Sequence, residues 1–398
     1  MALTGLSPFH RLLLGSTRAR GRATPDRDSA REGSRPAPAL TIGSQMSAAT
    51  ELNLSSREAD LKTSLAVVAV LALLAGVPLR TEAQTPGEVF RQVAPSVVVI
   101  RAKGSEVGSG RFNETGSGVL ISPDGKVMTA AHVVHAMDEI SVEFLGGETV
   151  SARVIASEPA ADLSLLQLDR VPPGAKVSPL ADSDKIRVGD PVIIVGAPYG
   201  LAYSLSNGLI SARWAPNTVY KSMPLAEFFQ TTATINTGNS GGPLFAMNGE
   251  VIGIVSHNIS KSGGSEGLGF VVTMNTAKKL LLEKRSIWGG LEGQILSEEM
   301  ADLLNLPPGT TGYLIKTVAK NSPAADAGLR GGTTLATIGG ESLVLGGDII
   351  LSAEGMSMGS AANIAKIRDV LSAKPSGTPF TATILRAGRV FEVTAKVP

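Results

Sequence analysis

The stretch Thr234-Ile-Asn-Thr-Gly-Asn-Ser-Gly-Gly-Pro-Leu244 decides how the rest of the chain is interpreted. In it, Ser240 lies among glycines at positions 238, 241 and 242. A serine hydroxyl becomes an effective nucleophile only when a neighbouring base takes its proton. Glycines allow a tight turn there because they tolerate positive φ, and the N–H groups of Gly238 and Ser240 could then form an oxyanion hole. The same string is also typical of an ordinary loop between strands.

The candidates for the base are few. The chain has four histidines, which are His10, His132, His135 and His257. Residues 238–242 also fit the nucleophile elbow G-x-S-x-G, but that fold needs an acid and then a histidine after the serine. The one histidine after Ser240 is His257, and no acidic residue later than Glu250 precedes it. An elbow enzyme is therefore disfavoured.

The order of His132, Asp162 and Ser240 along the chain is the order of the chymotrypsin triad. A subtilisin-like order would need Asp124 with His132, but these two residues flank a single short hairpin arm. The chymotrypsin order therefore predicts a convergence of three residues that are distant in sequence.

Asp162 is favoured over Asp169 as the acid of this triad. Asp162 opens the apolar run 163–168, which predicts a buried strand with the carboxylate at its edge. There it would accept the Nδ1–H of the base and fix its tautomer. Asp169 lies at the far end of the run, before Val171-Pro-Pro, in a turn context.

His132 and His135 form an H-x-x-H pair, which raises the alternative of a metal site assisted by Asp138 or Glu139. No third cluster of ligands stands out elsewhere in the sequence. We therefore expect no metal and no cofactor, and we expect His135 to lie on a helix surface.

Composition limits the classes of protein. The chain has 398 residues, enough for two ordinary domains and a tail, and its net charge of +1 predicts no bulk attraction to nucleic acid. It has no cysteine, which excludes disulfides and thiolate chemistry. Its 45 glycines and 23 prolines suit a turn-rich β protein.

The composition of the N-terminal segments differs from that of the rest of the chain. Residues 1–45 are Arg-rich and polar, and we expect a disordered or non-native extension. Residues 46–83 read as a signal peptide or a membrane anchor, because 64–79 is apolar and uncharged. This run is short for a membrane span, which needs about 20 residues, and Thr81-Glu-Ala83 is a candidate cleavage site. Anchoring through 64–79 stays open.

Two folded regions follow. Residues 85–285 hold many short apolar runs separated by turns such as Pro123-Asp-Gly-Lys126, without strand–helix alternation, which favours antiparallel β-barrels. We expect a loop over 103–115 and a closing helix over 276–284. Residues 287–398 mix helices and strands, with a helix capped by Ser297 and a final hairpin, and form a second, α+β domain.

Several motifs resemble those of the HtrA/Deg family, which are trypsin-like serine proteases of chymotrypsin fold that carry PDZ domains. The three catalytic blocks are Thr129-Ala-Ala-His132-Val-Val, Asp162-Leu-Ser-Leu-Leu and Gly238-Asn-Ser240-Gly-Gly-Pro-Leu. Gly116-Ser-Gly-Val-Leu-Ile-Ser-Pro-Asp-Gly is similar to a further family signature. Ser322-Pro-Ala-Ala-Asp-Ala-Gly-Leu and Gly347-Asp-Ile-Ile resemble a bacterial PDZ domain, here with a long insertion over 332–345.

The resemblance implies a double antiparallel β-barrel followed by one PDZ domain, and it implies roles for particular residues. His132 would be the general base, Ser240 the nucleophile and Asp162 the residue that orients the base. The remaining implied site residues fall into three groups: an oxyanion hole of Gly238, Asn239 and Ser240; substrate contacts at Thr234, Ile235, Ser256, His257 and Asn258; and a peptide carboxylate loop of Leu291, Glu292, Gly293 and Gln294.

The function implied is that of a serine endopeptidase of the periplasm or cell envelope that degrades unfolded or damaged proteins in quality control under stress. Peptide C-termini at the PDZ domain would modulate it, and a homotrimer is expected. Because no carboxylate occurs near Thr234, Ile235 or Ser256, we expect preference for small or medium aliphatic side chains. The alternative is a non-enzymatic chaperone or scaffold that binds peptides through the PDZ domain.

Overall fold

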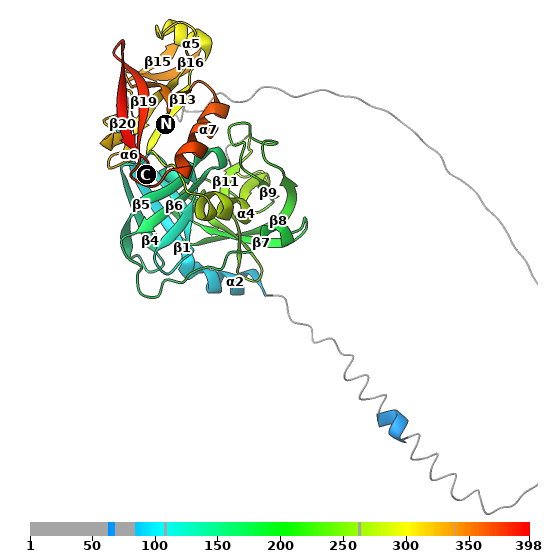
Figure 1. Cartoon of the computed structure of the whole chain (residues 1–398). Helices are drawn as coiled ribbons and strands as arrows, with labels where there is room; N and C mark the ends of the chain where they lie inside the picture. The colour runs from blue at the N-terminus through cyan, green and yellow to red at the C-terminus, as the bar shows by residue number, and fades with distance from the viewer. Residues whose placement is uncertain (1–62, 68–83, 107–109, 262–263, 339) are drawn as a thin grey trace, which may run out of the picture. The chain divides into compact units, whose positions relative to one another are not determined.

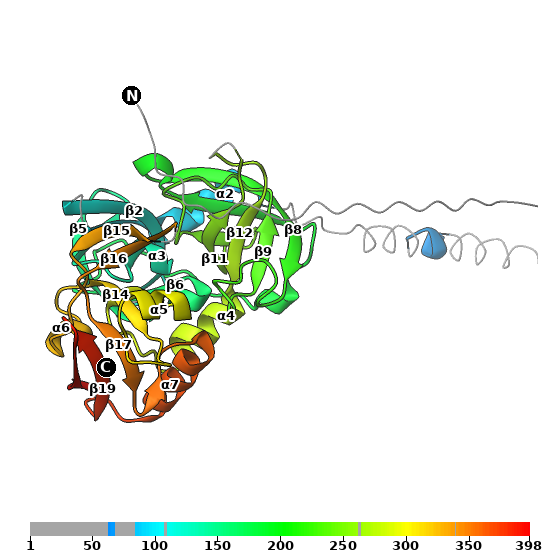
Figure 2. The same ribbon diagram turned by 90° about the horizontal axis from the view of Figure 1, so that it is seen from above.

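Two closed antiparallel β-barrels lie side by side in the computed structural model and carry the catalytic blocks (Figures 1 and 2). The structure describes residues 63–67, 84–106, 110–261, 264–338 and 340–398. The fold described here lies within Thr81–Pro398. The predictions for 1–45 and 46–83 fall outside the described residues, apart from a helical turn at 63–67. No helix within the described ranges is long and apolar enough to cross a membrane.

The first barrel closes in the strand order β1-β2-β3-β6-β5-β4. Its strands are β1 (Val97–Glu106), β2 (Gly110–Leu120), β3 (Lys126–Thr129), β4 (Glu139–Phe144), β5 (Thr149–Glu158) and β6 (Leu163–Leu168). Alternation of side chains puts every second residue inside, and β4 shows this pattern of alternate burial.

The second barrel closes in the order β10-β11-β12-β9-β8-β7. Its strands are β7 (Pro191–Gly196), β8 (Ser204–Trp214), β9 (Phe228–Thr231), β10 (Pro243–Ala246), β11 (Val251–Asn258) and β12 (Gly269–Thr273). The helices around the two barrels are α2 (Pro86–Val93), α3 (Ala131–Val134) and α4 (Met274–Lys278), with single turns η1 (Ala94–Ser96), η2 (Pro159–Ala161), η3 (Ser183–Lys185), η4 (Pro198–Gly200) and η5 (Lys279–Glu283).

One buried apolar cluster joins the barrels. It combines Val97 and Val119 of the first barrel with Phe228 and Phe245 of the second, and α2 adds Val89. Helix α2 begins where Thr85 and Glu88 form a capping box. Because the barrels share this core, the loops at their junction are held at fixed positions relative to one another.

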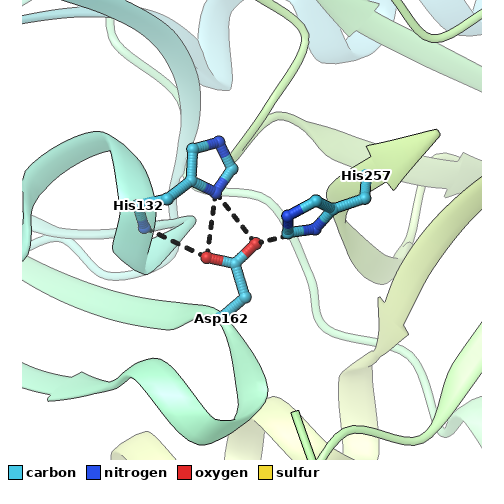
Figure 3. A group of neighbouring side chains, drawn as sticks. All are labelled: His132, Asp162 and His257. Carbon is cyan, nitrogen blue, oxygen red and sulfur yellow. Dashed lines mark hydrogen bonds and ion pairs between the residues drawn. The ribbon is translucent and has the colours of Figure 1, made fainter. Parts of the chain in front are cut away.

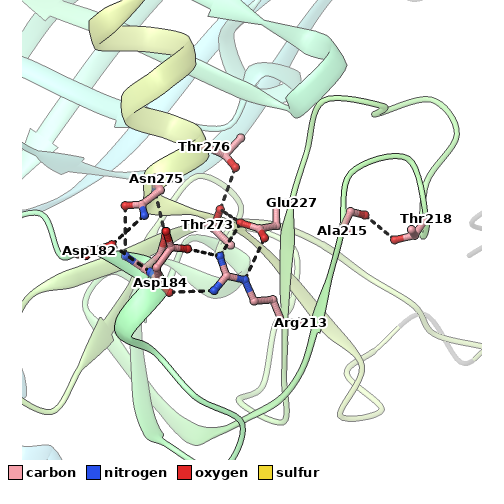
Figure 4. Close-up of polar contacts among 10 residues, drawn as sticks. Asp182, Asp184, Arg213, Ala215, Thr218, Glu227, Thr273, Asn275 and Thr276 are labelled. Carbon is pink, nitrogen blue, oxygen red and sulfur yellow. Dashed lines mark hydrogen bonds and ion pairs between the residues drawn. The ribbon is translucent and has the colours of Figure 1, made fainter.

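A polar network stabilises the outer side of the second barrel (Figure 4). Arg213 on β8 donates to both oxygens of Glu227, at 2.9 and 3.0 Å, and to Asp184. Glu227 also accepts from Thr273, at the end of β12. Asn275 at the start of α4 donates to Asp182 at 2.8 Å, so the network ties β8 and α4 to the loop before β7.

The C-terminal region forms a separate sheet of order β13-β14-β17-β19-β20, with β18 paired to β17. Asp348, with no exposed surface, holds it together by accepting from the Arg386 guanidinium at 2.6 and 2.7 Å. The elements are β13 (Leu291–Ile295), β14 (Tyr313–Val318), β17 (Ile349–Ala353), β18 (Met356–Ser357), β19 (Pro379–Arg386), β20 (Arg389–Lys396), α5 (Glu298–Leu303), α6 (Pro323–Asp326) and α7 (Ala361–Ala373). The insertion over 332–345 forms a hairpin of β15 (Thr334–Ile338) and β16 (Glu341–Leu345).

One expectation about elements was wrong, and another was confirmed with shifted bounds. The segment 103–115 is not a loop, because β1 and β2 pair along their length from Val97↔Val119 to Glu106↔Gly110. Its glycines fit into the pairing: a side chain on Gly104 would meet Phe112 and Met137. The closing helix over 276–284 is α4 followed by the wider π-helical turn η5, so it starts two residues earlier than expected and changes pitch.

Candidate active site

His132 lies on α3, one turn after β3 ends. The neighbouring residues Ala131, Val133 and Val134 are buried, so this short helix is fixed by its apolar side and presents the imidazole outward. The His132 side chain is 38% exposed and lines a cleft of ≈ 490 Å³. A base at this position can reach both its acid partner and solvent-borne substrate.

Asp162 meets this imidazole from the turn that precedes β6. It has a left-handed backbone (φ 53), which aspartate tolerates better than most residues. Its side chain is 5% exposed, and its oxygens lie 2.9 and 3.0 Å from His132 Nδ1 (Figure 3). The backbone N–H of His132 donates to the same carboxylate at 3.0 Å. A carboxylate only accepts, so Nδ1 carries the proton and Nε2 faces the cleft with its lone pair free.

The loop that carries Ser240 is fastened to the first barrel by Ser117, a residue that the sequence analysis quoted only within a family signature. Ser117 has no exposed surface, and its hydroxyl donates to Gly238 O at 2.7 Å and accepts from Ala197 N at 2.9 Å. Its N–H donates to Ser240 O at 2.8 Å. Gly241 has φ +80, and a Cβ there would lie 2.1 Å from Thr129 Oγ1. Only glycine permits this approach of the loop to the strand before His132.

The Ser240 hydroxyl donates to Ser256 O at 3.4 Å, and within the described part of the chain it makes no hydrogen bond to His132. The link from Ser240 to the acid runs instead through Ser256, whose own hydroxyl donates to Asp162. In enzymes without substrate, catalytic hydrogen bonds are often long and tighten only in the complex. In this structure the Ser240 hydroxyl is therefore hydrogen-bonded to Ser256 O and not to His132.

The proposed oxyanion donors differ from their neighbour. Asn239 N–H donates to Asn236 O at 3.0 Å, whereas the N–H groups of Gly238 and Ser240 make no hydrogen bond among the residues described. Gly238 has φ +100 and would clash with Ala197 O at 2.1 Å if it carried a Cβ. The two N–H groups named from the sequence are thus available to an anionic oxygen.

The expected substrate contacts divide into three places. Ser256 and His257 adjoin Asp162, and His257 lines the same cleft as His132. Thr234 instead lines a second, polar cavity of ≈ 340 Å³ together with Asn239. Ile235 is 2% exposed and packs in the core of the second barrel, with its carbonyl accepting from Asn258. Its side chain therefore does not face the cleft.

Electrostatics favour an ion pair between the acid and the base when His132 is protonated. Burial opposes charge on both groups, but their mutual hydrogen bond and attraction dominate, so the pKa of Asp162 is lowered and that of His132 is raised. Burial lowers the pKa of His257, reinforced by the nearby His132 and opposed by Asp162. His257 is therefore held neutral more readily than His132.

His135 is not the helix-surface residue expected from the sequence. Its Nδ1 lies 2.7 Å from Ser157 Oγ and its Nε2 lies 3.0 Å from the carbonyl of Leu291. It contacts β13 and also lines the cleft of His132, and burial lowers its pKa. Trp288 Nε1 donates to its backbone carbonyl at 2.9 Å, which couples the helix of the base to the start of the C-terminal sheet. An i, i+3 spacing could not distinguish these two directions.

Residues 291–294 were expected as a loop and instead begin strand β13, paired with β14 from Leu291↔Val318 onward. Glu292 forms an ion pair with Lys316 at 3.3 Å, and both line the cleft that holds His132. With Thr317, three residues of the C-terminal sheet therefore line the cleft, which no local motif in the sequence indicated.

Comparison with known proteins follows this geometry. Residues 116–254 match the family described as Trypsin-like peptidase domain. A "Probable periplasmic serine endoprotease DegP-like" of Pseudomonas putida is 35% identical over 263 residues, covering 64% of this chain and 53% of the relative. One of the same name from Halomonas elongata is 33% identical over 290 residues, covering 71% of this chain and 56% of the relative. The chain spans about half the length of the curated relatives it matches.

A solved structure described as "HtrA-type protease AlgW with tripeptide" shares 28% identity and covers 78% of this chain and 96% of its own, with a TM-score of 0.46. The fold and the site define a trypsin-like serine peptidase domain, with two closed barrels, a His–Asp pair and a serine in a glycine-rich loop. Residues 116–254 belong to the trypsin-like peptidase family, and the chain is similar to HtrA/DegP-type serine proteases in its motifs and relatives.

Proposed function

We propose that this protein is a serine endopeptidase that hydrolyses peptide bonds of unfolded or damaged proteins in the periplasm or cell envelope. The observation that carries the proposal is the double contact of His132 Nδ1 with Asp162, at 2.9 and 3.0 Å, beside a serine loop locked by Ser117. Ser240 is the nucleophile, His132 the general base and Asp162 the residue that orients it.

The reaction follows from where the protons lie. Asp162 holds the proton on His132 Nδ1, so Nε2 accepts the proton of Ser240 as Oγ attacks the substrate carbonyl carbon. The N–H groups of Gly238 and Ser240 stabilise the negative oxygen that forms. Nε2–H then protonates the leaving amine and the C–N bond breaks, which leaves an acyl-serine. A water molecule, deprotonated by His132, attacks that ester and releases the acid and the free serine hydroxyl.

The resting bond from Ser240 to Ser256 O must be exchanged before this attack. A serine side chain moves between staggered rotamers about χ1, and a bound substrate strand along 256–258 would compete for the same carbonyl. Substrate binding would thus direct the hydroxyl toward His132.

Residues 287–398 are proposed to be a PDZ domain that binds peptide C-termini. Strand β13 ends the order of the described sheet and offers an edge for strand addition, with Leu291, Glu292, Gly293 and Gln294 as peptide contacts. Because Glu292 and Lys316 also line the cleft of His132, peptide binding at β13 would alter the surroundings of the catalytic site. A homotrimer and membrane anchoring through 64–79 complete the proposal.

A fluorophosphonate probe tests the central assignment. The wild-type protein should be labelled on Ser240 and should degrade a disordered model substrate such as casein, whereas Ser240→Ala should do neither. The competing function is a scaffold that binds peptides without hydrolysis. Cleavage of casein by Ser240→Ala at the wild-type rate would refute the role of the triad, and peptide binding by an unlabelled wild-type protein would favour the scaffold.

A further inference from the structure

His257 places a second imidazole beside the His132–Asp162 pair (Figure 3). The two ring centroids are 5.3 Å apart, with 52° between the ring planes. His257 Nδ1 lies 3.5 Å from Asp162 Oδ2, and His132 Nδ1 lies 2.9 Å from Oδ1. One carboxylate therefore lies between two imidazoles, one from α3 beside the first barrel and one from β11 of the second.

Two imidazoles and a carboxylate are a donor set that binds Zn²⁺ and related divalent transition metals. Bonds of about 2.0–2.1 Å at a tetrahedral angle separate two ligand atoms by roughly 3.3–3.4 Å. From the single oxygen Oδ2 of Asp162, the distances to His132 Nδ1 and His257 Nδ1 are 3.0 and 3.5 Å, on either side of that value. All three ligand atoms lie within 4.8 Å of one another, and no other such group occurs among the residues described.

The cluster is open to an incoming ion. The side chains of His132 and His257 are 38% and 40% exposed, and both face the cleft of ≈ 490 Å³, while Asp162 is 5% exposed. Two ligands can therefore meet an ion at the surface, with the third ligand behind them. Water can occupy a fourth position.

Binding has to displace existing hydrogen bonds. The Ser256 hydroxyl lies 2.6 Å from His257 Nδ1 and donates to Asp162, so it must rotate away from the nitrogen. The proton on His132 must move from Nδ1 to Nε2, because a neutral imidazole binds a metal only through the nitrogen that has a free lone pair. These exchanges weaken binding relative to a preformed structural site and make it reversible.

We propose that His132, Asp162 and His257 form a binding site for a divalent transition-metal ion of the zinc class, and that the bound ion inhibits the enzyme reversibly. The ion takes the place of the proton between His132 Nδ1 and Asp162, and the imidazole stays neutral by carrying its proton on Nε2, which can then no longer accept the proton of Ser240. The base then loses its orienting partner. The inhibition rests on the proposed function, whereas the binding does not.

The binding is tested on the full chain carrying Ser240→Ala and stripped with EDTA. Calorimetric titration with Zn²⁺ should show one site per chain. In the same background His257→Gln should bind at least about tenfold more weakly, since a ligand is lost, while His257→Asp, which supplies an oxygen ligand, should bind more tightly than His257→Gln. Absence of binding to the Ser240→Ala chain, or equal affinity with and without His257, would overturn the site.

An NMR measurement needs no change at position 257. In the Ser240→Ala chain, Zn²⁺ should shift the imidazole resonances of His132 and His257 together and leave those of His135 in place, because both of its ring nitrogens already contact Ser157 and Leu291. Zinc-dependent shifts confined to other residues would refute the assignment.

The inhibitory effect is tested separately on the protein with Ser240 intact. Each variant is compared with its own rate in EDTA, so a direct effect of His257 on substrate binding cancels. Zn²⁺ should abolish peptide cleavage, EDTA should restore it, and His257→Gln should need at least about ten times more Zn²⁺. Tight zinc binding without loss of activity would refute inhibition, while an inactive metal-free enzyme would refute the proposed function and leave the site standing.

Discussion

Removal of the Ser117 hydroxyl should damage catalysis from a position that does not touch substrate. Ser117→Ala leaves Gly238 O and Ala197 N without the partners that they have at 2.7 and 2.9 Å, in a place with no solvent access. Each unsatisfied buried polar group costs about 1–3 kcal/mol, so for two groups the free energy of unfolding should fall by roughly 2–6 kcal/mol. Relaxation of the loop should move the N–H groups of Gly238 and Ser240, and displacement of this kind lowers kcat by about 10- to 100-fold.

Ser96→Ala is the matched control for this variant. Ser96 is equally buried, donates to Val93 O at 2.7 Å and lies 2.6 Å from Ser178 Oγ, away from the cleft. Denaturant unfolding of both variants and kcat and KM on a fluorogenic peptide would separate the effects. We expect both variants to lose stability and only Ser117→Ala to lose kcat. Equal kcat in the two variants would refute the idea that Ser117 holds the oxyanion loop.

Three further outcomes follow from the structure. Asp162→Asn should lower kcat by about 10⁴-fold with little change in KM. The single amide oxygen cannot accept the Nδ1–H of His132, the backbone N–H of His132 and the Ser256 hydroxyl at once. A loss of kcat under tenfold in steady-state kinetics would contradict the role of Asp162. With EDTA present, kcat/KM should fall as the pH drops through the pKa of His132, since the base must be neutral. The midpoint of this fall should lie above the pKa of an ordinary histidine, because Asp162 outweighs burial and raises the pKa of His132. A midpoint below pH about 6 would be inconsistent with that shift. Asp348→Ala should cost the C-terminal sheet about 1.5–3 kcal/mol, because it removes the buried acceptor of the Arg386 guanidinium and of Arg330 N–H, while Arg386 keeps its bond to Gly328 O. Differential hydrogen exchange should show the loss in β17 and β19, and equal loss across both barrels would argue against a local effect.

Much of the barrel architecture could be predicted because its determinants are local. The turn at Pro123-Asp-Gly-Lys126 and the alternation along each strand depend on neighbours within a few residues. The end of β2 pairs with β3 across that turn, and β6 lies on the predicted run 163–168. The error at 103–115 has a physical reason. Strand pairing there is stabilised by contacts between β1 and β2, such as Gly104 against Phe112, and a Gly/Ser/Asn composition conceals that pairing.

The chemical identity of the site could likewise be inferred from the order of residues along the chain. His132 and Asp162 meet as expected, and the N–H groups of Gly238 and Ser240 make no other hydrogen bond in the part of the chain described. Ser117 and the contribution of Glu292 to the cleft could not be found this way, because each acts across more than a hundred positions of sequence.

Residue types, their spacing and their order determined which groups can perform acid–base chemistry here, since an imidazole, a carboxylate and a hydroxyl keep their intrinsic reactivity wherever they lie. Tertiary structure alone decided which hydrogen bonds those groups make. His132 turns toward Asp162 while His135, three residues later, turns to Leu291, and His257 joins the acid from the other barrel. These choices depend on directions and distances between distant strands, which a linear order of residues does not contain.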